Sequence, residues 1–310
     1  MRKIAFLYPG QGAQKIGMGQ DFYEKSPLAK EIFDQSCEIL SQDMKQICFE
    51  ENELLDRTDY TQAAMVVTCM AMTKEIVSRG ILPDMTAGLS LGEYCAITAA
   101  GGMSVEDAIR MVWLRGQLMH HAVPEKTGGM AAVFGLSGEK ITQLLAPMDG
   151  VSVANYNCPG QIVITGKKEA IENASTVLKE AGARRVIPLN VSGPFHSPYL
   201  KEAGEKLYEA LQKIAFKELN IPYVANVNAE IVTEISKTKE LLKEQISSSV
   251  LWEQSMRVMI AEGVDTFIEI GPGKTLSSFM KKIDKTVKVF HIGTIDELEK
   301  VLETIENKGE

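Results

Sequence analysis

The sequence predicts an α/β protein in two parts: a large domain built on a parallel sheet, and a small βαββαβ domain inserted into it. Strand-like apolar runs alternate with long amphipathic segments, which is the pattern of a parallel sheet covered by helices. Between 129 and 189 the pattern changes to six short elements in the order βαββαβ. A chain of 310 residues with 45% hydrophobic composition can bury both cores.

The elements of the large domain follow from the period of the apolar residues. Ser104, followed by Asp107, forms a capping box for one helix, and the acidic side chains in its first turn favour the positive end of its dipole. Strands are predicted at 3–8, 85–89, 264–270 and 288–292, and helices at 22–41, 61–79, 104–121 and 199–215.

The inserted segment reads as a ferredoxin-like unit between two turn-rich crossings, 124–129 and 190–194. We therefore expect a small domain at 128–191 and a discontinuous large domain at 1–127 and 192–310, with a ligand site in the cleft between them. The unit comprises strands at 130–134, 151–156, 161–165 and 185–189, and helices at 137–145 and 168–181.

Composition excludes several classes of protein. A formal net charge of −8 disfavours non-specific binding to nucleic acid or to an anionic membrane. The five cysteines are odd in number and never in CxxC spacing, so neither a disulfide framework nor a zinc site is indicated, and we expect a cytoplasmic protein without a metal. Each apolar run ends well short of the roughly 20 residues of a membrane span.

The run MTAGLSLGEY contains Gly88-x-Ser90-x-Gly92 where an apolar strand gives way to a helical segment. In that context GxSxG is a nucleophile elbow of an α/β-hydrolase-like domain, because the glycines permit a sharp turn that exposes the serine oxygen. The N–H of Leu91 then points the same way and can donate to an oxyanion. The alternative is a tight turn with a capping serine.

A nucleophilic serine needs a base, and His196 is the best placed of the four histidines. It lies in a loop with two prolines directly after the inserted unit, where domain junctions commonly carry catalytic groups. An ordinary loop histidine remains the alternative. His120 and His121 end a helix, and His291 lies in a strand.

Two glycine-rich turns raise the question of phosphate binding. The first, Gly10-Gln11-Gly12, continues with neither GxGxxG nor GxxxxGK[ST], so it presents either the side-chain amide NH2 of Gln11 as a donor or a plain turn after the first strand. The second, 271–274, is better explained as a strand-ending turn.

Taken together, the motifs resemble those of the malonyl-CoA:acyl carrier protein transacylase family, and the similarity spans essentially the whole chain. The family usually has GHSxGE at the elbow, whereas Leu89 replaces that histidine here. The shared motifs are Gly10-Gln-Gly12, the elbow through Glu93, Arg115-Gly116, Gly193-Pro-Phe-His-Ser197 and Glu269-Ile-Gly-Pro-Gly273.

The resemblance implies a mechanism. Ser90 is the nucleophile and His196 its base and later acid, with the second imidazole nitrogen held by the backbone carbonyl of Gln245. Gln11 helps to hold the oxyanion together with the N–H of Leu91.

Arg115 is either an exposed helix arginine or a buried carboxylate fork, and the resemblance favours the fork. In the family this arginine binds the free carboxylate of malonyl through two parallel contacts. Met119, one turn later, is expected to line the same pocket, and Phe195 beside His196 to crowd an α-methyl branch. Malonyl-CoA is then the substrate, and no cofactor is implied.

The implied partner is an acyl carrier protein that brings the phosphopantetheine thiol, and we expect a monomer. Because such carriers are acidic, a local basic patch is needed, for which Lys281 and Lys282, or Arg184 and Arg185, are candidates. The alternatives are an acyltransferase of polyketide synthesis, a serine thioesterase or other hydrolase, and a non-catalytic carrier-binding subunit.

Overall fold

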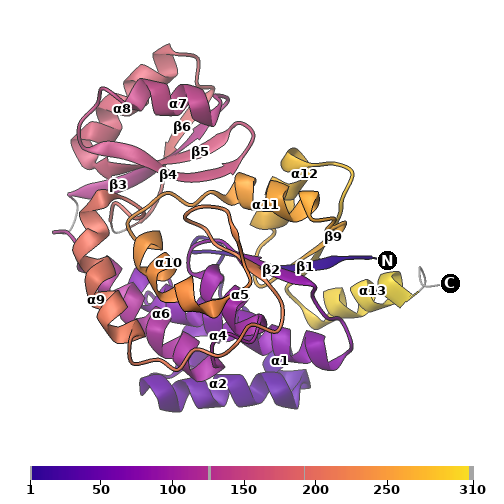
Figure 1. Ribbon diagram of the computed structural model, residues 1–310. Coiled ribbons are helices and arrows are strands. Elements are labelled where there is room, and N and C mark those ends of the chain that lie inside the picture. The colour runs from indigo at the N-terminus through magenta and orange to yellow at the C-terminus, as the bar shows by residue number, and fades with distance from the viewer. Residues whose placement is uncertain (1, 125–126, 192, 307–310) are drawn as a thin grey trace.

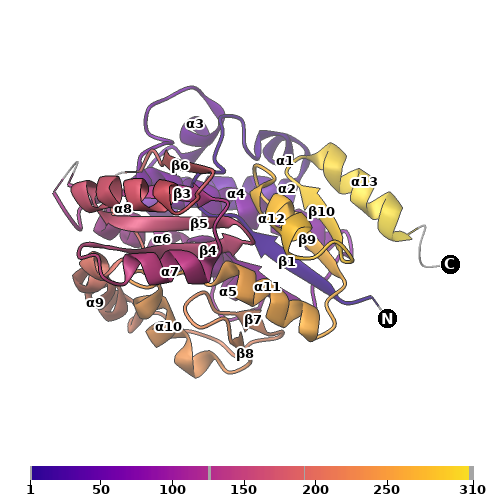
Figure 2. The same cartoon turned by 90° about the horizontal axis from the view of Figure 1, so that it is seen from above.

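The computed structural model describes residues 2–124, 127–191 and 193–306 and has the predicted fold class, a mixed α/β fold with two separate sheets (Figures 1 and 2). The large sheet has the strand order β10-β9-β1-β2-β7-β8. All neighbouring strands are parallel except the last pair, which is antiparallel. The strands are β1 (Ile4–Tyr8), β2 (Met85–Gly88), β7 (Tyr223–Val224), β8 (Ile231–Val232), β9 (Thr266–Ile270) and β10 (Lys288–Ile292).

Helices cover both faces of this sheet, as a parallel sheet requires. On β1, Ala5 and Leu7 pack into one apolar cluster with α11 (Trp252–Ala261) and α12 (Thr275–Ile283). Phe6 and Tyr8 point to the other face and pack with α4 (Thr58–Ser78) and α5 (Gly92–Ala99). Figure 1 shows the two helix layers on opposite sides of β1 and β2.

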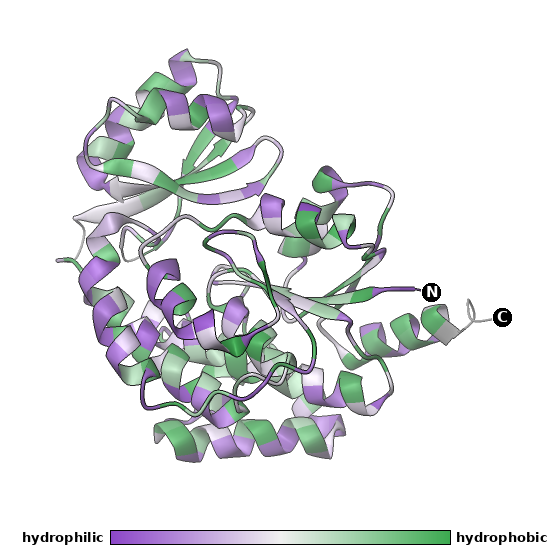
Figure 3. Cartoon of the chain, viewed as in Figure 1, coloured by the Kyte–Doolittle hydropathy of each residue, from purple (hydrophilic) through white to green (hydrophobic). Residues whose placement is uncertain are grey.

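The predicted single helix at 22–41 is wrong, because the chain breaks at Ser26 into α1 (Gln20–Lys25) and α2 (Pro27–Leu40). Pro27 cannot continue a helix that precedes it but is well suited to start the next, and Ser26 Oγ caps α2 by accepting from the N–H of Ala29. Along α2, hydrophobic and hydrophilic residues alternate as expected of a surface helix (Figure 3).

The remaining helices of the large domain lie around this framework. Ser104 Oγ accepts from the N–H of Asp107, so the predicted start of α6 is confirmed. The structure adds helices that the sequence reasoning did not predict, α3 and α10 among them. The helices are α3 (Met44–Phe49), α6 (Val105–His120), α9 (Lys201–Leu211), α10 (Thr238–Gln245) and α13 (Ile295–Glu306).

The small domain has the predicted βαββαβ order and an antiparallel sheet ordered β4-β5-β3-β6. One face of β3 packs through Ala131 and Val133 on the two helices of the unit, and Met130 and Ala132 face the large domain. The elements are β3 (Gly128–Phe134), α7 (Gly138–Leu145), β4 (Val151–Cys158), β5 (Gln161–Lys167), α8 (Lys168–Glu180) and β6 (Arg185–Pro188).

Backbone hydrogen bonds connect the two domains next to the cleft. Val250 of the large domain donates to the carbonyl of Ala154 at 2.8 Å and accepts from the N–H of Tyr156 at 2.9 Å. Strand β4 is thereby tied to the segment that follows α10. In the described part of the chain, no helix has the length and apolar character needed to cross a membrane.

Candidate active site

Ser90 occupies a sharp turn between the end of β2 and the start of α5. The turn depends on two glycines, since a Cβ at Gly88 would lie 1.9 Å from the carbonyl carbon of Gly92, and a Cβ at Gly92 would lie 2.3 Å from the carbonyl oxygen of Tyr8. Ser90 itself has a left-handed backbone, with φ of 56°. Such strain in a non-glycine residue is characteristic of functional sites.

The loop after the small domain brings His196 to Ser90, with 2.8 Å between Nε2 and Oγ. On the other side of the ring, Nδ1 lies 2.9 Å from the backbone carbonyl oxygen of Gln245. A carbonyl can only accept, so Nδ1 carries the proton and Nε2 is free to accept from the serine hydroxyl. This arrangement is the geometry of a nucleophile with its general base.

His196 is 4% exposed, and burial together with the nearby positive charge of Arg115 lowers the pKa of its imidazole to about 4. The hydrogen bond to Gln245 opposes this shift. At neutral pH the ring is therefore uncharged and able to take a proton.

Arg115 extends from α6 into the same site and is completely buried. Its Nη1 donates to Gln62 Oε1 at 2.6 Å, and its Nη2 donates to Gln245 Oε1 at 2.9 Å and to Ser90 Oγ at 3.1 Å. Nε has no partner within the described residues. Burial lowers the pKa of the guanidinium from its ordinary value. The site thus holds a desolvated cation whose Nη2 contacts the serine oxygen and whose Nε is a free donor.

Close packing of α4 against α6 makes the contact between Arg115 and Gln62 possible. A Cβ at Gly116 would lie 2.9 Å from the carbonyl oxygen of Thr58, so only glycine lets the two helices approach this closely. Met119, one turn further along α6, is 2% exposed, and its sulfur accepts from Gln62 Nε2 at 3.3 Å.

Gln11 lies in the turn after β1 and lines the same cavity as Ser90 and Leu91. Its side-chain amide donates to Thr58 Oγ1 at 3.0 Å. Within the described chain, the backbone N–H groups of Gln11 and Leu91 donate to no protein acceptor. Two free main-chain donors therefore accompany the serine, and the side chain of Gln11 is held to one side.

A cavity of about 430 Å³ opens above these groups, between the two domains. The large domain contributes the serine, the histidine, the arginine and Phe195, which is 5% exposed. The small domain contributes the face of its sheet that carries Met130 and Ala132, together with Asn155. The predicted residues that line this cavity are Gln11, Ser90, Leu91, Arg115, Met119, Phe195 and His196, whereas Gln245 lies behind the imidazole of His196.

Three buried residues of the site were missed by sequence reasoning. Gln62 could have been suspected as a polar side chain on the otherwise apolar part of α4, and Glu93 directly follows the elbow motif. No sequence pattern points to Asn226, because it follows β7, a strand of two residues that is too short to show the alternation of apolar and polar residues. Burial, more than the hydrogen bonds that oppose it, raises the pKa of Glu93 to about 7.

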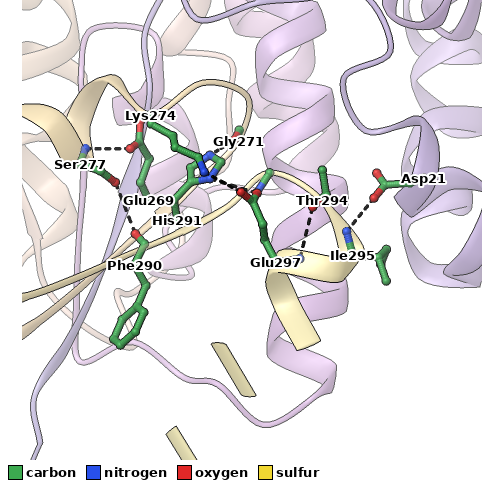
Figure 4. A network of polar contacts seen from close by, with 11 residues as sticks. Asp21, Glu269, Gly271, Lys274, Ser277, Phe290, His291, Thr294, Ile295 and Glu297 are labelled. Carbon is green, nitrogen blue, oxygen red and sulfur yellow. Dashed lines mark hydrogen bonds and ion pairs between the residues drawn. The ribbon is translucent and has the colours of Figure 1, made fainter. Parts of the chain in front are cut away.

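The turn at 271–274 is a junction between β9 and α12 (Figure 4). Both carboxylate oxygens of Glu269 accept from the first turn of α12, at the N–H groups of Leu276 and Ser277. Lys274 pairs with Glu297 of α13 at 2.8 Å. The helix N-terminus is thus occupied by the protein's own carboxylate, which agrees with the prediction of a structural turn.

The other predicted contact residues lie at the edge of the cavity or away from it. Lys281 and Lys282 are exposed on α12, and Lys282 Nζ donates to Gln161 Oε1, a cavity residue, at 3.4 Å. The rings of His120 and His121 contact each other at the end of α6. None of the histidines other than His196 lines the cavity.

Comparison with known proteins adds independent information. Residues 5–295 match the family model described as an acyl transferase domain. A malonyl CoA-acyl carrier protein transacylase of Bacillus subtilis is 45% identical, over 100% of this chain and 99% of the relative. The crystal structure of the protein of that name from Clostridium perfringens has a TM-score of 0.95 at 42% identity, covering 99% of this chain and 98% of that one. A type II polyketide synthase acyl carrier protein in complex with its malonyl-transacylase also matches, with TM-score 0.94, 35% identity and coverage of 97% and 99%.

Proposed function

The chain belongs to the malonyl-CoA:acyl carrier protein transacylase family of acyltransferases, and we propose that it moves malonyl from malonyl-CoA to the phosphopantetheine thiol of an acyl carrier protein through a malonyl ester on Ser90. One observation carries the proposal. Ser90 Oγ lies between a neutral histidine nitrogen and a buried guanidinium, at 2.8 and 3.1 Å. A nucleophile, a base and a carboxylate receptor are then within reach of one small acyl group.

In the first half-reaction, Ser90 Oγ forms a bond to the thioester carbonyl carbon as its proton passes to His196 Nε2. The carbonyl oxygen becomes an oxyanion, for which the free N–H groups of Gln11 and Leu91 are the available donors. Collapse of the tetrahedral intermediate breaks the carbon–sulfur bond. The departing coenzyme A sulfur then takes the proton from His196.

The second half-reaction runs the same chemistry with the carrier thiol. His196 Nε2 accepts the thiol proton, the sulfur attacks the malonyl ester carbon, and the same donors hold the oxyanion. The carbon–oxygen bond breaks, and Ser90 Oγ recovers its proton from the imidazolium. The carbonyl of Gln245 orients the ring but stabilises the imidazolium less than a carboxylate would, which suffices for a reactive thioester.

Selectivity for malonyl is assigned to Arg115. Its unpaired Nε and its Nη2 form one edge of the guanidinium, and a carboxylate can bind this edge at two points when Nη2 gives up its contact with Ser90 Oγ. An acetyl group would leave this buried cation without an anionic partner, which is unfavourable. Met119 and Phe195 limit the room beside the acyl chain.

For the carrier, the exposed lysines of α12 are the proposed contact, because Lys282 reaches a cavity residue. Changing Lys281 and Lys282 to Glu should raise the KM for the acidic carrier and leave Ser90 acylation by malonyl-CoA unchanged. Lys300→Glu, a charge reversal at one exposed position of α13, is the matched control for Lys282→Glu alone. Equal effects of these two single changes would contradict the assignment. A monomer is expected by light scattering.

The test of the proposed function is dependence on an acceptor. With malonyl-CoA and holo acyl carrier protein, the product should be malonyl-carrier, and release of coenzyme A should stop after one equivalent per enzyme when the carrier is omitted. Continued release without the carrier would indicate a hydrolase. Carrier binding with no acyl transfer would indicate a non-catalytic subunit. Carriers of fatty-acid and of polyketide synthesis, compared side by side, separate those two pathways.

A further inference from the structure

The backbone of Ser90 needs support to keep its conformation. Its φ of 56° lies in the left-handed region, which a residue with a Cβ avoids unless the surroundings impose it. Relaxation of this turn would move both Oγ and the N–H of the next residue, Leu91. The nucleophile and one oxyanion donor therefore depend on the same few atoms.

Asn226 holds these atoms from the neighbouring strand, just after β7. Its Oδ1 accepts from the N–H of Ser90 at 2.7 Å, and its Nδ2 donates to the carbonyl of Gly88 at 2.7 Å. One planar amide thus bridges the residues on both sides of the turn. The side chain is completely buried, so water does not compete for either bond.

The main chain of Asn226 is fixed as well. Its N–H donates to Glu93 Oε2 at 3.2 Å, and its carbonyl accepts from the N–H of Leu251 at 2.8 Å. Glu93 Oε2 also accepts from Gln245 Nε2, which in turn donates to the carbonyl of Ser90 at 2.8 Å. The N–H and C=O of Ser90 are therefore both held, the first by Asn226 and the second by Gln245.

We propose that Asn226 is a positioning residue of the acyl transfer reaction, which holds the strained turn so that Ser90 Oγ stays in line with His196 Nε2. The inference rests on the proposed role of Ser90 as nucleophile. Asn226 acts through the backbone of Ser90 and touches none of the reacting atoms. The groups that would bind substrate, chiefly Arg115, lie on other elements.

Removing the amide separates positioning from binding. In Asn226→Ala, the single-turnover rate of Ser90 acylation by malonyl-CoA should fall about a hundredfold, as expected for a displacement near 1 Å. The concentration of malonyl-CoA at half-maximal rate should stay close to the wild-type value, because the binding groups are intact. An undiminished rate would overturn the inference, and so would a loss confined to substrate affinity.

Asn226→Asp gives a readout that a purely structural role would not move. One oxygen can still accept from Ser90, but an ionised carboxylate cannot donate to Gly88, whereas the protonated acid can. The rate deficit relative to wild type should therefore shrink between about pH 8 and about pH 5.5, in the range where buried carboxyl groups take up protons. His196, with a pKa of about 4, stays neutral throughout. Because Glu93 contacts residue 226, the series is also measured in the Glu93→Gln background, where the new carboxyl group titrates without that neighbour. An equal deficit at both pH values would count against the proposal.

Asn52→Ala is the matched control, since Asn52 also ties together the backbone of one loop. Its amide donates to the carbonyls of Ile47 and Glu50 and accepts from the N–H groups of Leu54 and Leu55. This change should lower stability without slowing acylation. If Asn226→Ala does not fold, the pH series on Asn226→Asp decides. Absence of a Ser90 adduct in the wild type would instead refute the proposed function.

Discussion

Ser90 and His196 have the same left-handed backbone angle, φ of 56°, and their side chains meet at 2.8 Å. The two residues lie in different turns, one after β2 and one after the small domain. Each turn is strained, so the packing around it must supply the stabilisation that the local backbone conformation lacks. The hydrogen bond between nucleophile and base thus depends on how the large domain packs around both turns.

The first prediction concerns the elbow glycines. Gly88→Ala should destabilise the protein by about 3 kcal/mol or more, because its Cβ would overlap backbone atoms of Gly92 that cannot move aside. Gly129→Ala is the control, since a Cβ there meets nothing within 4 Å. Denaturant unfolding of both variants checks the prediction, and similar midpoints would contradict it.

Local signals explain how much of the fold and site the sequence could predict. The GxSxG turn, the capped start of α6 and the six elements of the small domain each have a signature a few residues long. The split at Ser26 was missed because amphipathic periodicity runs through it. The burial of Arg115 arises from the close approach of α4 at Gly116, and the position of Asn226 from strand pairing of β2 with β7. Both are long-range contacts that no short window of sequence contains.

The second prediction concerns acyl selectivity. In Arg115→Lys, malonyl transfer should fall about a hundredfold, because an ammonium cannot reproduce the two-point contact of a guanidinium edge. The malonyl-to-acetyl ratio of kcat/KM should fall with it. Arg110→Lys, on the same helix but in an exposed pair with Glu106, should leave the ratio unchanged. An unaltered ratio in Arg115→Lys would contradict the proposed contact between Arg115 and the malonyl carboxylate.

The third prediction concerns the protonation of the base. With only four histidines in the chain, the ring signals of His196 can be assigned in NMR spectra by comparison with His196→Ala. They should titrate with a pKa of about 4, since burial and Arg115 disfavour the imidazolium. In Arg115→Met the pKa should rise, because a positive neighbour has been removed. An unchanged pKa of His196 in this variant would argue against electrostatic coupling between His196 and Arg115.

The fourth prediction concerns stability and pH. Burial raises the pKa of Glu93 from 4.5 to about 7, so the folded protein keeps a proton that the unfolded chain has already lost. The contribution of Glu93 to the free energy of unfolding should thus be fully present below about pH 4.5. It should decrease by on the order of 3 kcal/mol as the pH rises through 7. The difference in unfolding free energy between wild type and Glu93→Gln, measured across this range, should show the decline. A difference independent of pH would disprove it.

The most direct measurement is the mass of the acyl-enzyme. After incubation with malonyl-CoA alone, intact protein should carry one malonyl group, and peptide mapping should locate it on Ser90. Ser90→Ala should carry none, although Arg115 and His196 remain in place. An adduct at undiminished level in Ser90→Ala, or one mapped to another residue of the wild type, would contradict the account.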